Sequence, residues 1–257
     1  MEYLHTLIYL CPLVFLAGFI DSAAGGGGLI TIPAYMLTGM PAHHVFGTNK
    51  LSASIGTTVA AGRFIKNKAI DIRTALISGM ASLIGAAAGS QLALLLDDRT
   101  FRLLMIIAVP CVALFLLIRK DRSNENESGH QNLSLRKSTA LATAIGFSIG
   151  MYDGIIGPGT GTFAIIAYNT FMRFDYKTAS GNAKILNLAS NVASLFTFAL
   201  AGNVIFVVGL PAAVFGVAGN YIGSGFAIRK GAKFIRPMLF IVLLMLLVKV
   251  IYDFISA

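Results

Sequence analysis

Charged residues are scarce in this chain of 257 residues: Asp, Glu, Lys and Arg make up 12% of it, whereas soluble domains carry about 25%. Hydrophobic residues account for 56%, and the mean hydropathy is +0.77. This composition excludes an ordinary soluble domain, and the apolar stretches are long enough to form membrane-spanning helices. The sequence therefore predicts an all-α integral membrane protein. Its net charge of +9 reflects topology rather than nucleic-acid binding.

Signatures of several other classes are also missing. Cys11 and Cys111 lie in apolar stretches, which favours packed or lipid-facing side chains over a disulfide. The four histidines have no zinc spacing, and no G-x-x-x-x-G-K-[ST] phosphate loop is present, so this chain does not drive itself with ATP. We expect no metal and no cofactor. The sequence has no cluster of His, Cys or acidic ligands for an enzyme, so we expect a protein that is not an enzyme.

The apolar pattern predicts five helical segments in the first half: Leu4–Ile20, Leu29–Thr38, Ala42–Phe64, Ile72–Leu96 and Phe101–Ile118. The second is too short to cross a bilayer at about 1.5 Å per residue. Four glycines, Gly25 to Gly28, separate it from the first because such a run cannot continue a stable helix. A polar stretch, Arg119–Lys137, predicts a flexible linker.

The same plan recurs after the linker. Matching pairs follow one another in order at a nearly constant offset, with Gly47 and Lys50 recurring as Gly181 and Lys184. Other pairs are Asp21 with Asp153, the Gly25–Gly28 run with the glycines of 157–161, Gly85 with Gly219, and Gly89 with Gly223. We predict a first repeat over 1–120, a cytoplasmic linker over 121–135 and a second repeat over 136–257.

The distribution of basic residues predicts how the halves are oriented. If the first two segments of each half turn back as re-entrant or half-spanning elements, 15 of the 20 basic residues fall on one side of the membrane. If they made a single crossing, the basic residues would divide almost evenly. We therefore predict an inverted repeat of two five-segment halves with broken helices at the glycine runs, external termini and a cytoplasmic linker.

Two lysines within apolar segments mark the candidate site. An intramembrane lysine costs roughly 2.5–3.5 kcal/mol on insertion scales, yet Lys50 and Lys184 occupy matched positions. Polar residues share their helix faces, so we predict a pocket for a small anion. The alternative is that each lysine lies near a helix end and extends to the surface. The predicted contacts are Thr48, Asn49, Lys50 and Thr57 in the first half and Asn182, Lys184, Asn187 and Asn191 in the second.

The glycine runs and two matched acids complete the predicted site. Helices that restart beside Gly27 and Gly28, and beside Gly159 and Gly161, would point free N–H groups at the membrane interior, which favours an anion. The alternative is a packing turn without a ligand. The two matched acids are Asp21 and Asp153. They either cap the restarted helices and pair with the lysines, or carry protons.

These motifs resemble the TauE/SafE sulfite exporter family over essentially the whole chain. The resemblance rests on Gly18-x-x-Asp21, the Gly25–Gly28 run followed by Leu29-Ile30-x-x-Pro33, the run Gly47-Thr48-Asn49-Lys50, and their second-half partners. It implies transport of small sulfur-containing anions such as sulfite, sulfonates and sulfoacetate across the bacterial cytoplasmic membrane. Pro33 has no counterpart near Ile166, so the second broken element is expected to differ in geometry.

Taken together, the motifs and the resemblance favour a secondary transporter that moves a small anion outward by alternating access at a midplane site. The expected partners are this anion and the lipid bilayer of the inner membrane, with no nucleic acid, and a homo-oligomer is left open. An anion channel, or an uptake permease for another oxyanion, is the alternative.

Overall fold

The computed structural model describes residues 4–101, 103, 134–231, 233–235 and 237–238. Within these residues the regular structure is helical, without a strand. The predicted fifth segment, Phe101–Ile118, lies outside them except for Phe101 and Leu103, and so does most of the linker. The helices are α1 (Leu4–Ala24), α2 (Gly28–Met36), α3 (Ala42–Lys66), α4 (Ile72–Leu94), α6 (Leu135–Ile155), α7 (Thr160–Phe171), α8 (Tyr176–Leu200) and α9 (Phe206–Lys230).

Helix boundaries differ from the predictions by a few residues. The first segment was predicted to end at Ile20, but α1 continues through Asp21 to Ala24, because the residues before the first glycine are compatible with a helix. Helix α6 begins at Leu135, so the end of the predicted polar linker, Arg119–Lys137, is helical.

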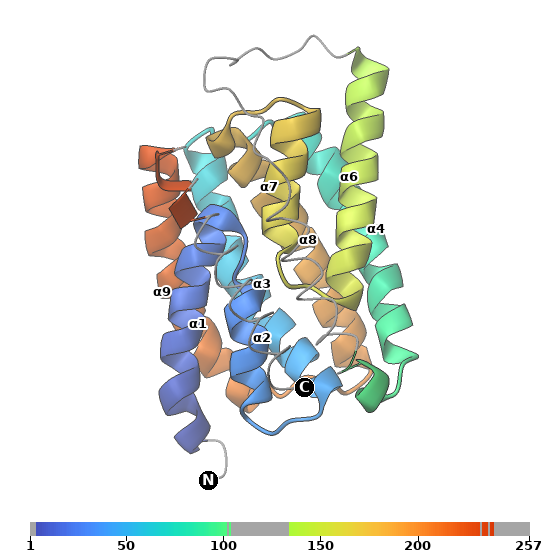
Figure 1. The fold of residues 1–257 in the computed structure, drawn as a ribbon, viewed down its shortest axis with the longest axis vertical. Coiled ribbons are helices and arrows are strands. Elements are labelled where there is room, and N and C mark those ends of the chain that lie inside the picture. The colour runs from blue at the N-terminus through green and yellow to red at the C-terminus, as the bar shows by residue number, and fades with distance from the viewer. Residues whose placement is uncertain (1–3, 102, 104–133, 232, 236, 239–257) are drawn as a thin grey trace, which may run out of the picture.

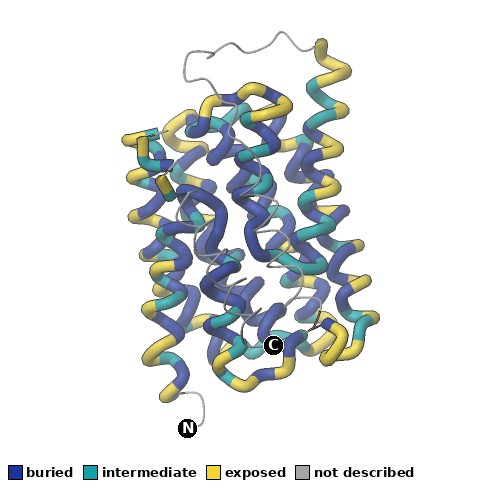
Figure 2. Tube along the Cα trace, in the orientation of Figure 1, coloured by how far each residue is buried: buried dark blue, intermediate teal, exposed yellow. Residues whose placement is uncertain are grey.

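Among the helices that the structure describes, four are long and apolar enough to cross a membrane: α1, α4, α8 and α9. Large apolar side chains stand exposed on the outer helices, where lipid would cover them; Met80 on α4 and Val207 on α9 are 71% and 73% exposed. Figure 2 shows this pattern of exposed positions on the peripheral helices around a buried centre. The chain is a multi-pass integral membrane protein.

Both glycine runs break the chain inside the molecule, where α1 gives way to α2 and α6 to α7. Gly25 and Gly157 have φ angles of +76° and +86°, which glycine adopts without a Cβ penalty. The breaks also touch, because a Cβ on Gly25 would collide with the backbone of Gly161. Thr162 in the first turn of α7 donates a hydrogen bond of 2.7 Å from Oγ1 to the Ala24 carbonyl oxygen.

Corresponding helices of the two halves run in opposite directions. In Figure 1, α1 rises from the end where the N-terminus lies and α6 descends from the opposite end; α4 descends and α9 rises. Each half also packs its fourth helix on the first helix of the other half. Gly85 and Gly89 of α4 press against the α6 backbone, and Gly219 and Gly223 of α9 press against α1. Each pair has the spacing G-x-x-x-G, which permits this close approach of two helix backbones.

Loops at the two ends of the molecule are tied by matched contacts. Thr48 Oγ1 near the start of α3 accepts a 3.0 Å hydrogen bond from the Ile205 backbone N–H. At the other end, Asn182 Oδ1 near the start of α8 accepts a 3.0 Å hydrogen bond from the Asp71 backbone N–H. Thr48 matches Asn182 and Asp71 matches Ile205 at the offset of the predicted repeat, so corresponding positions make the same contact at both ends.

Candidate functional site

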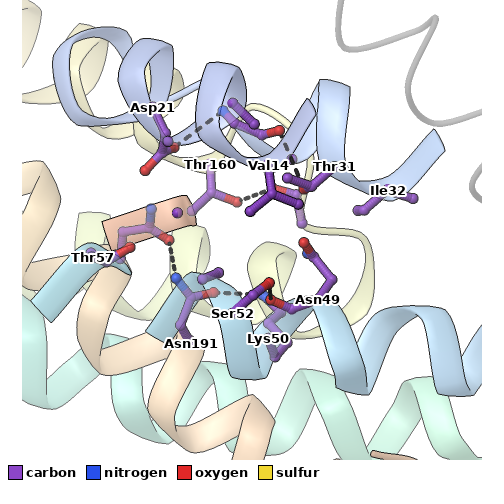
Figure 3. Close-up of a pocket in the computed structure, with 18 of the residues that line it drawn as sticks. Val14, Asp21, Thr31, Ile32, Asn49, Lys50, Ser52, Thr57, Thr160 and Asn191 are labelled. Atoms are coloured by element: carbon purple, nitrogen blue, oxygen red, sulfur yellow. Dashed lines mark hydrogen bonds between the residues drawn. The ribbon is translucent and has the colours of Figure 1, made fainter. Parts of the chain in front are cut away.

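A cavity of about 60 Å³ lies where the first helix break meets α3, α8 and α9. At roughly 10–15 Å³ for each water, it has room for about four to six waters or a small anion. In Figure 3, Asp21 and Thr31 lie across the cavity from Asn49, Lys50 and Thr57. The other polar side chains that line it are Ser52, Asp153, Thr160, Asn187, Asn191 and Asn220.

The Lys50 ammonium is buried and fully hydrogen-bonded. Its Nζ lies 2.6 Å from Asp153 Oδ2 and 2.9 Å from the Asp153 carbonyl oxygen. The third donor reaches Asn191 Oδ1 at 3.2 Å. Lys50 is 2% exposed, so it does not extend to the surface. Its charge is compensated by an aspartate from the other half of the chain, as a buried charge requires.

Lys184 forms the corresponding pair in the opposite sense. Its Nζ donates to Asp21 Oδ2 at 2.7 Å. The lysine is completely buried, whereas the Asp21 side chain is 14% exposed and faces the cavity. Each lysine of one half is therefore neutralised by the aspartate of the other half, which agrees with the pairing role considered for these acids. Together the four charges cancel.

Both aspartates also hold the restarted helices. Asp21 Oδ1 accepts a hydrogen bond of 3.2 Å from the Gly27 backbone N–H, directly before α2. Asp153 Oδ1 accepts one of 2.7 Å from Thr160 Oγ1, the first residue of α7. A carboxylate thus already occupies the anion position at the start of α2, where helix ends favour negative charge. An incoming anion has to share this end with Asp21 or approach from the cavity side.

Backbone geometry differs between the two breaks, as the missing counterpart of Pro33 led us to expect. Gly27, before α2, has φ −56°, whereas Gly159, before α7, has φ +81°. The segment from Asp153 to Lys184 is longer than the matched segment from Asp21 to Lys50, and the difference lies after the break, where α7 has 12 residues and α2 has 9.

Comparison with known proteins fits this architecture. The family model described as "Sulfite exporter TauE/SafE" matches residues 10–250. The chain belongs to the TauE/SafE family. It is therefore a membrane transporter of the sulfite exporter type, and the resemblance noted in the sequence is confirmed.

Curated relatives carry the same general description. A probable membrane transporter protein, YfcA, of Escherichia coli K12 is 34% identical over 98% of this chain and 95% of its own length. A probable membrane transporter protein of Haemophilus influenzae is 34% identical over 93% of this chain and 92% of its own. The Bacillus subtilis protein YunE, also a probable membrane transporter, is 21% identical over 96% of this chain and 98% of its own. No solved structure matches.

The structure gathers part of the predicted site around the cavity. Nine of the predicted residues line it: Asp21, Gly27, Gly28, Asn49, Lys50, Thr57, Asp153, Asn187 and Asn191. Five do not: Thr48, Gly159, Gly161, Asn182 and Lys184. Among the latter, Thr48 and Asn182 tie down loops, Gly161 packs on Gly25, and Lys184 lies behind Asp21.

Several lining residues escaped the sequence analysis. Thr31 is the one threonine of α2, and Ser52 is one of several hydroxyl residues in α3. Ser52 Oγ accepts a 2.9 Å hydrogen bond from the Tyr35 hydroxyl. Asn220 follows Gly219 in α9, whereas the two lysine motifs are in α3 and α8, so Asn220 belongs to a different helix from either lysine. An amide inside an apolar segment was the available signal for Asn220, although nothing in the sequence alone placed it in the same cavity as Asn49.

Proposed function

We propose that this protein is a secondary transporter for a small sulfur-containing anion of the sulfite, sulfonate or sulfoacetate type. The observation that carries the proposal is the small polar cavity at the meeting point of the helix breaks, into which both halves contribute side chains. Its amides and hydroxyls can donate hydrogen bonds to an oxyanion. Because the two ion pairs cancel, the bound anion's charge is stabilised by dipoles, which suits a singly charged species, such as hydrogensulfite or a simple sulfonate, better than the dianions sulfite and sulfoacetate.

We propose that Lys50 contacts the anion by exchanging one of its present partners. The longest of its three hydrogen bonds, 3.2 Å to Asn191 Oδ1, is the one most easily given up. The Asn191 amide is also bonded to Asn187 through its nitrogen at 3.2 Å, so it keeps a partner when it turns. The lysine would then face both Asp153 and the anion without leaving its helix.

The proposed mechanism is alternating access by two inverted five-segment repeats. Its support is the opposite direction of corresponding helices and the repetition of contacts across the halves, including both ion pairs. A molecule built from two such halves has two related conformations, in which the halves exchange their local arrangements. Asp21, which is partly exposed to the cavity, is the proposed site of any proton coupling.

We further propose that the protein lies in the bacterial inner membrane, with the linker in the cytoplasm, and works as an exporter. An inside-negative membrane potential favours the outward movement of an anion by about 2.3 kcal/mol per charge for every 100 mV. An exporter of a singly charged anion therefore needs no other energy source when the internal concentration is high.

The test is flux into and out of proteoliposomes that contain the purified protein. The panel consists of sulfite, sulfoacetate, thiosulfate, sulfate and chloride, and empty liposomes are the control. We expect saturable sulfite or sulfonate flux and counterflow, in which unlabelled anion on one side drives uptake of labelled anion from the other. Flux without saturation or counterflow would indicate a channel, and flux of none of the sulfur anions would refute the proposed substrate class.

A further inference from the structure

The cavity is one-sided with respect to the internal repeat. Where the lining comes from both members of a matched pair, the members are Asp21 and Asp153, Gly25 and Gly157, Gly28 and Thr160, Ala53 and Asn187, and Thr57 and Asn191. Three other polar groups of the lining have apolar counterparts at the matched positions of the other half, whereas Lys50 corresponds to Lys184, which does not line the cavity. Asn49, Ser52 and Asn220 correspond to Ala183, Leu186 and Ala86, each of which is completely buried. The mirror position is therefore packed with apolar side chains.

The packing around Asn220 shows that this asymmetry is built into the helix contacts. A Cβ on either Gly18 or Gly56 would come within 2.7 Å of Asn220 Nδ2, so two glycines make room for the amide. At the mirror position, the counterpart of Gly56 is Ser190 and that of Asn220 is Ala86. In one half the larger of the two facing side chains is on α9, and at the matched contact of the other half it is on α8. The polar amide therefore enters the cavity in one half only.

Two of the four asparagines that line the cavity, Asn49 and Asn220, have unmet hydrogen-bonding capacity. Their Oδ1 atoms are buried without a partner among the described residues. Among these residues Asn49 Nδ2 donates no hydrogen bond and Asn220 Nδ2 donates one, of 3.0 Å to the Gly216 carbonyl oxygen, so each amide keeps an N–H donor for an oxyanion. These side chains are 5% and 4% exposed. Unsatisfied buried amides are costly, most of all inside a membrane, and here both line the same cavity.

We infer that the anion binds off the pseudo-two-fold axis, in the part of the site formed by α1, α2, α3 and α9, and that the Asn49 and Asn220 amides are its specificity-determining contacts. One chain then binds one anion. The region around Lys184 is filled by side chains and binds no anion, and Lys184 serves to neutralise the charge of Asp21. This inference rests on the proposed transport function.

Each asparagine can be replaced by the residue that the other half of the chain uses at the matched position. Asn49→Ala copies Ala183, and Asn220→Ala copies Ala86, so the substituted side chain is one that the matched helix already accommodates. We expect each variant to bind sulfite about ten-fold more weakly or worse, since a charge-assisted hydrogen bond is lost. The measurement is equilibrium binding of sodium sulfite to the purified full-length protein, with affinity and stoichiometry determined together, and one sulfite per chain is expected.

Ser224→Ala is the matched control. Ser224 lies one turn after Asn220 on α9, is completely buried and donates a 3.1 Å hydrogen bond to the Tyr221 carbonyl oxygen, but does not line the cavity. Its loss should leave sulfite affinity unchanged. If an alanine variant does not fold, Asn49→Asp and Asn220→Asp keep the size of the side chain and should abolish binding, because they place a carboxylate against the anion.

Wild-type affinity in both asparagine variants, or two sulfite ions per chain, would overturn the one-sided site while leaving the transport function standing. A wild-type protein that neither binds nor moves any of the tested anions would instead refute the proposed function, and the inference with it. If the asparagine variants and Ser224→Ala lost the same amount of sulfite affinity, the two asparagines would contribute to packing and not to anion binding.

Discussion

Lys184 and Asp21 form an ion pair of 2.7 Å that joins α8 to α1, and Lys50 and Asp153 form one of 2.6 Å that joins α3 to α6. Each half of the chain therefore supplies the counter-charge for the other half's intramembrane lysine. A lysine without its aspartate, or an aspartate without its lysine, would be an uncompensated charge in a medium of low dielectric constant. Each ion pair thus holds one helix break against the helix, α3 or α8, that carries the lysine of the other half.

The first prediction concerns the coupling within the Lys184–Asp21 pair. Lys184→Met and Asp21→Asn should each lower the free energy of unfolding by about 3–5 kcal/mol, because each leaves one buried charge unpaired. The double variant should recover most of this loss. Thermal or denaturant unfolding of the purified protein in detergent gives the coupling energy. Additive losses would mean that the two groups do not interact.

How far the sequence predicted this site can be judged from these pairs. The apolar composition and glycine runs predicted the helices and breaks closely, since both depend on local properties of the chain. The cost of a charge in lipid singled out Lys50 from the sequence, and in the structure this lysine is buried and lines the cavity. The partner of each lysine was left open, since Asp21 and Lys184 are distant in sequence and meet only through tertiary packing. Asn220 was missed for the same reason.

A second prediction concerns the break at Gly25. Gly25→Ala should prevent stable folding, because its φ is +76° and the new Cβ would collide with the Gly161 backbone. Gly39 has the same φ of +76° but no neighbour within 4 Å of a Cβ. Gly39→Ala should therefore cost only the backbone strain, about 1–2 kcal/mol. Yield of monodisperse protein after detergent extraction and its unfolding midpoint compare the two; equal behaviour would mean that contact between the breaks contributes nothing.

A third prediction fixes the orientation in the membrane. The ends of α3 and α9 and the starts of α4, α6 and α8 lie at one end of the molecule in Figure 1, and this end carries most of the described basic residues. We expect it to face the cytoplasm. In a background with Cys11 and Cys111 replaced by alanine, an impermeant thiol reagent applied to intact cells should label Leu95→Cys but not Lys66→Cys. The reverse pattern would invert the proposed topology.

A fourth prediction tests whether Lys50 contacts the anion. Lys50→Met alone would strand Asp153, so the informative variant is Lys50→Met with Asp153→Asn, which removes both charges and should fold. We expect it to bind sulfite about ten- to a hundred-fold more weakly, corresponding to roughly 1.5–3 kcal/mol. Arg at position 50 should rescue poorly, because its planar fork needs more space than the ammonium. Sulfite affinity close to wild type in the folded double variant would remove Lys50 from the binding site.

The last prediction separates a proton carrier from a helix cap. Asp21 is 14% exposed beside the cavity, whereas Asp153 is 3% exposed and enclosed by Lys50 and Thr160. If protons travel with the anion, Asp21 is the acid that water can reach. Asp21→Asn should then make flux independent of an imposed pH gradient, while the Gly27 N–H keeps an acceptor, since Asn caps a helix as well as Asp. Flux in proteoliposomes with and without the gradient is the measurement, with Asp153→Asn as the matched comparison. An unaltered response to the gradient in folded Asp21→Asn would leave this carboxylate as the cap of α2 and the counter-ion of Lys184, and would exclude it as the proton carrier.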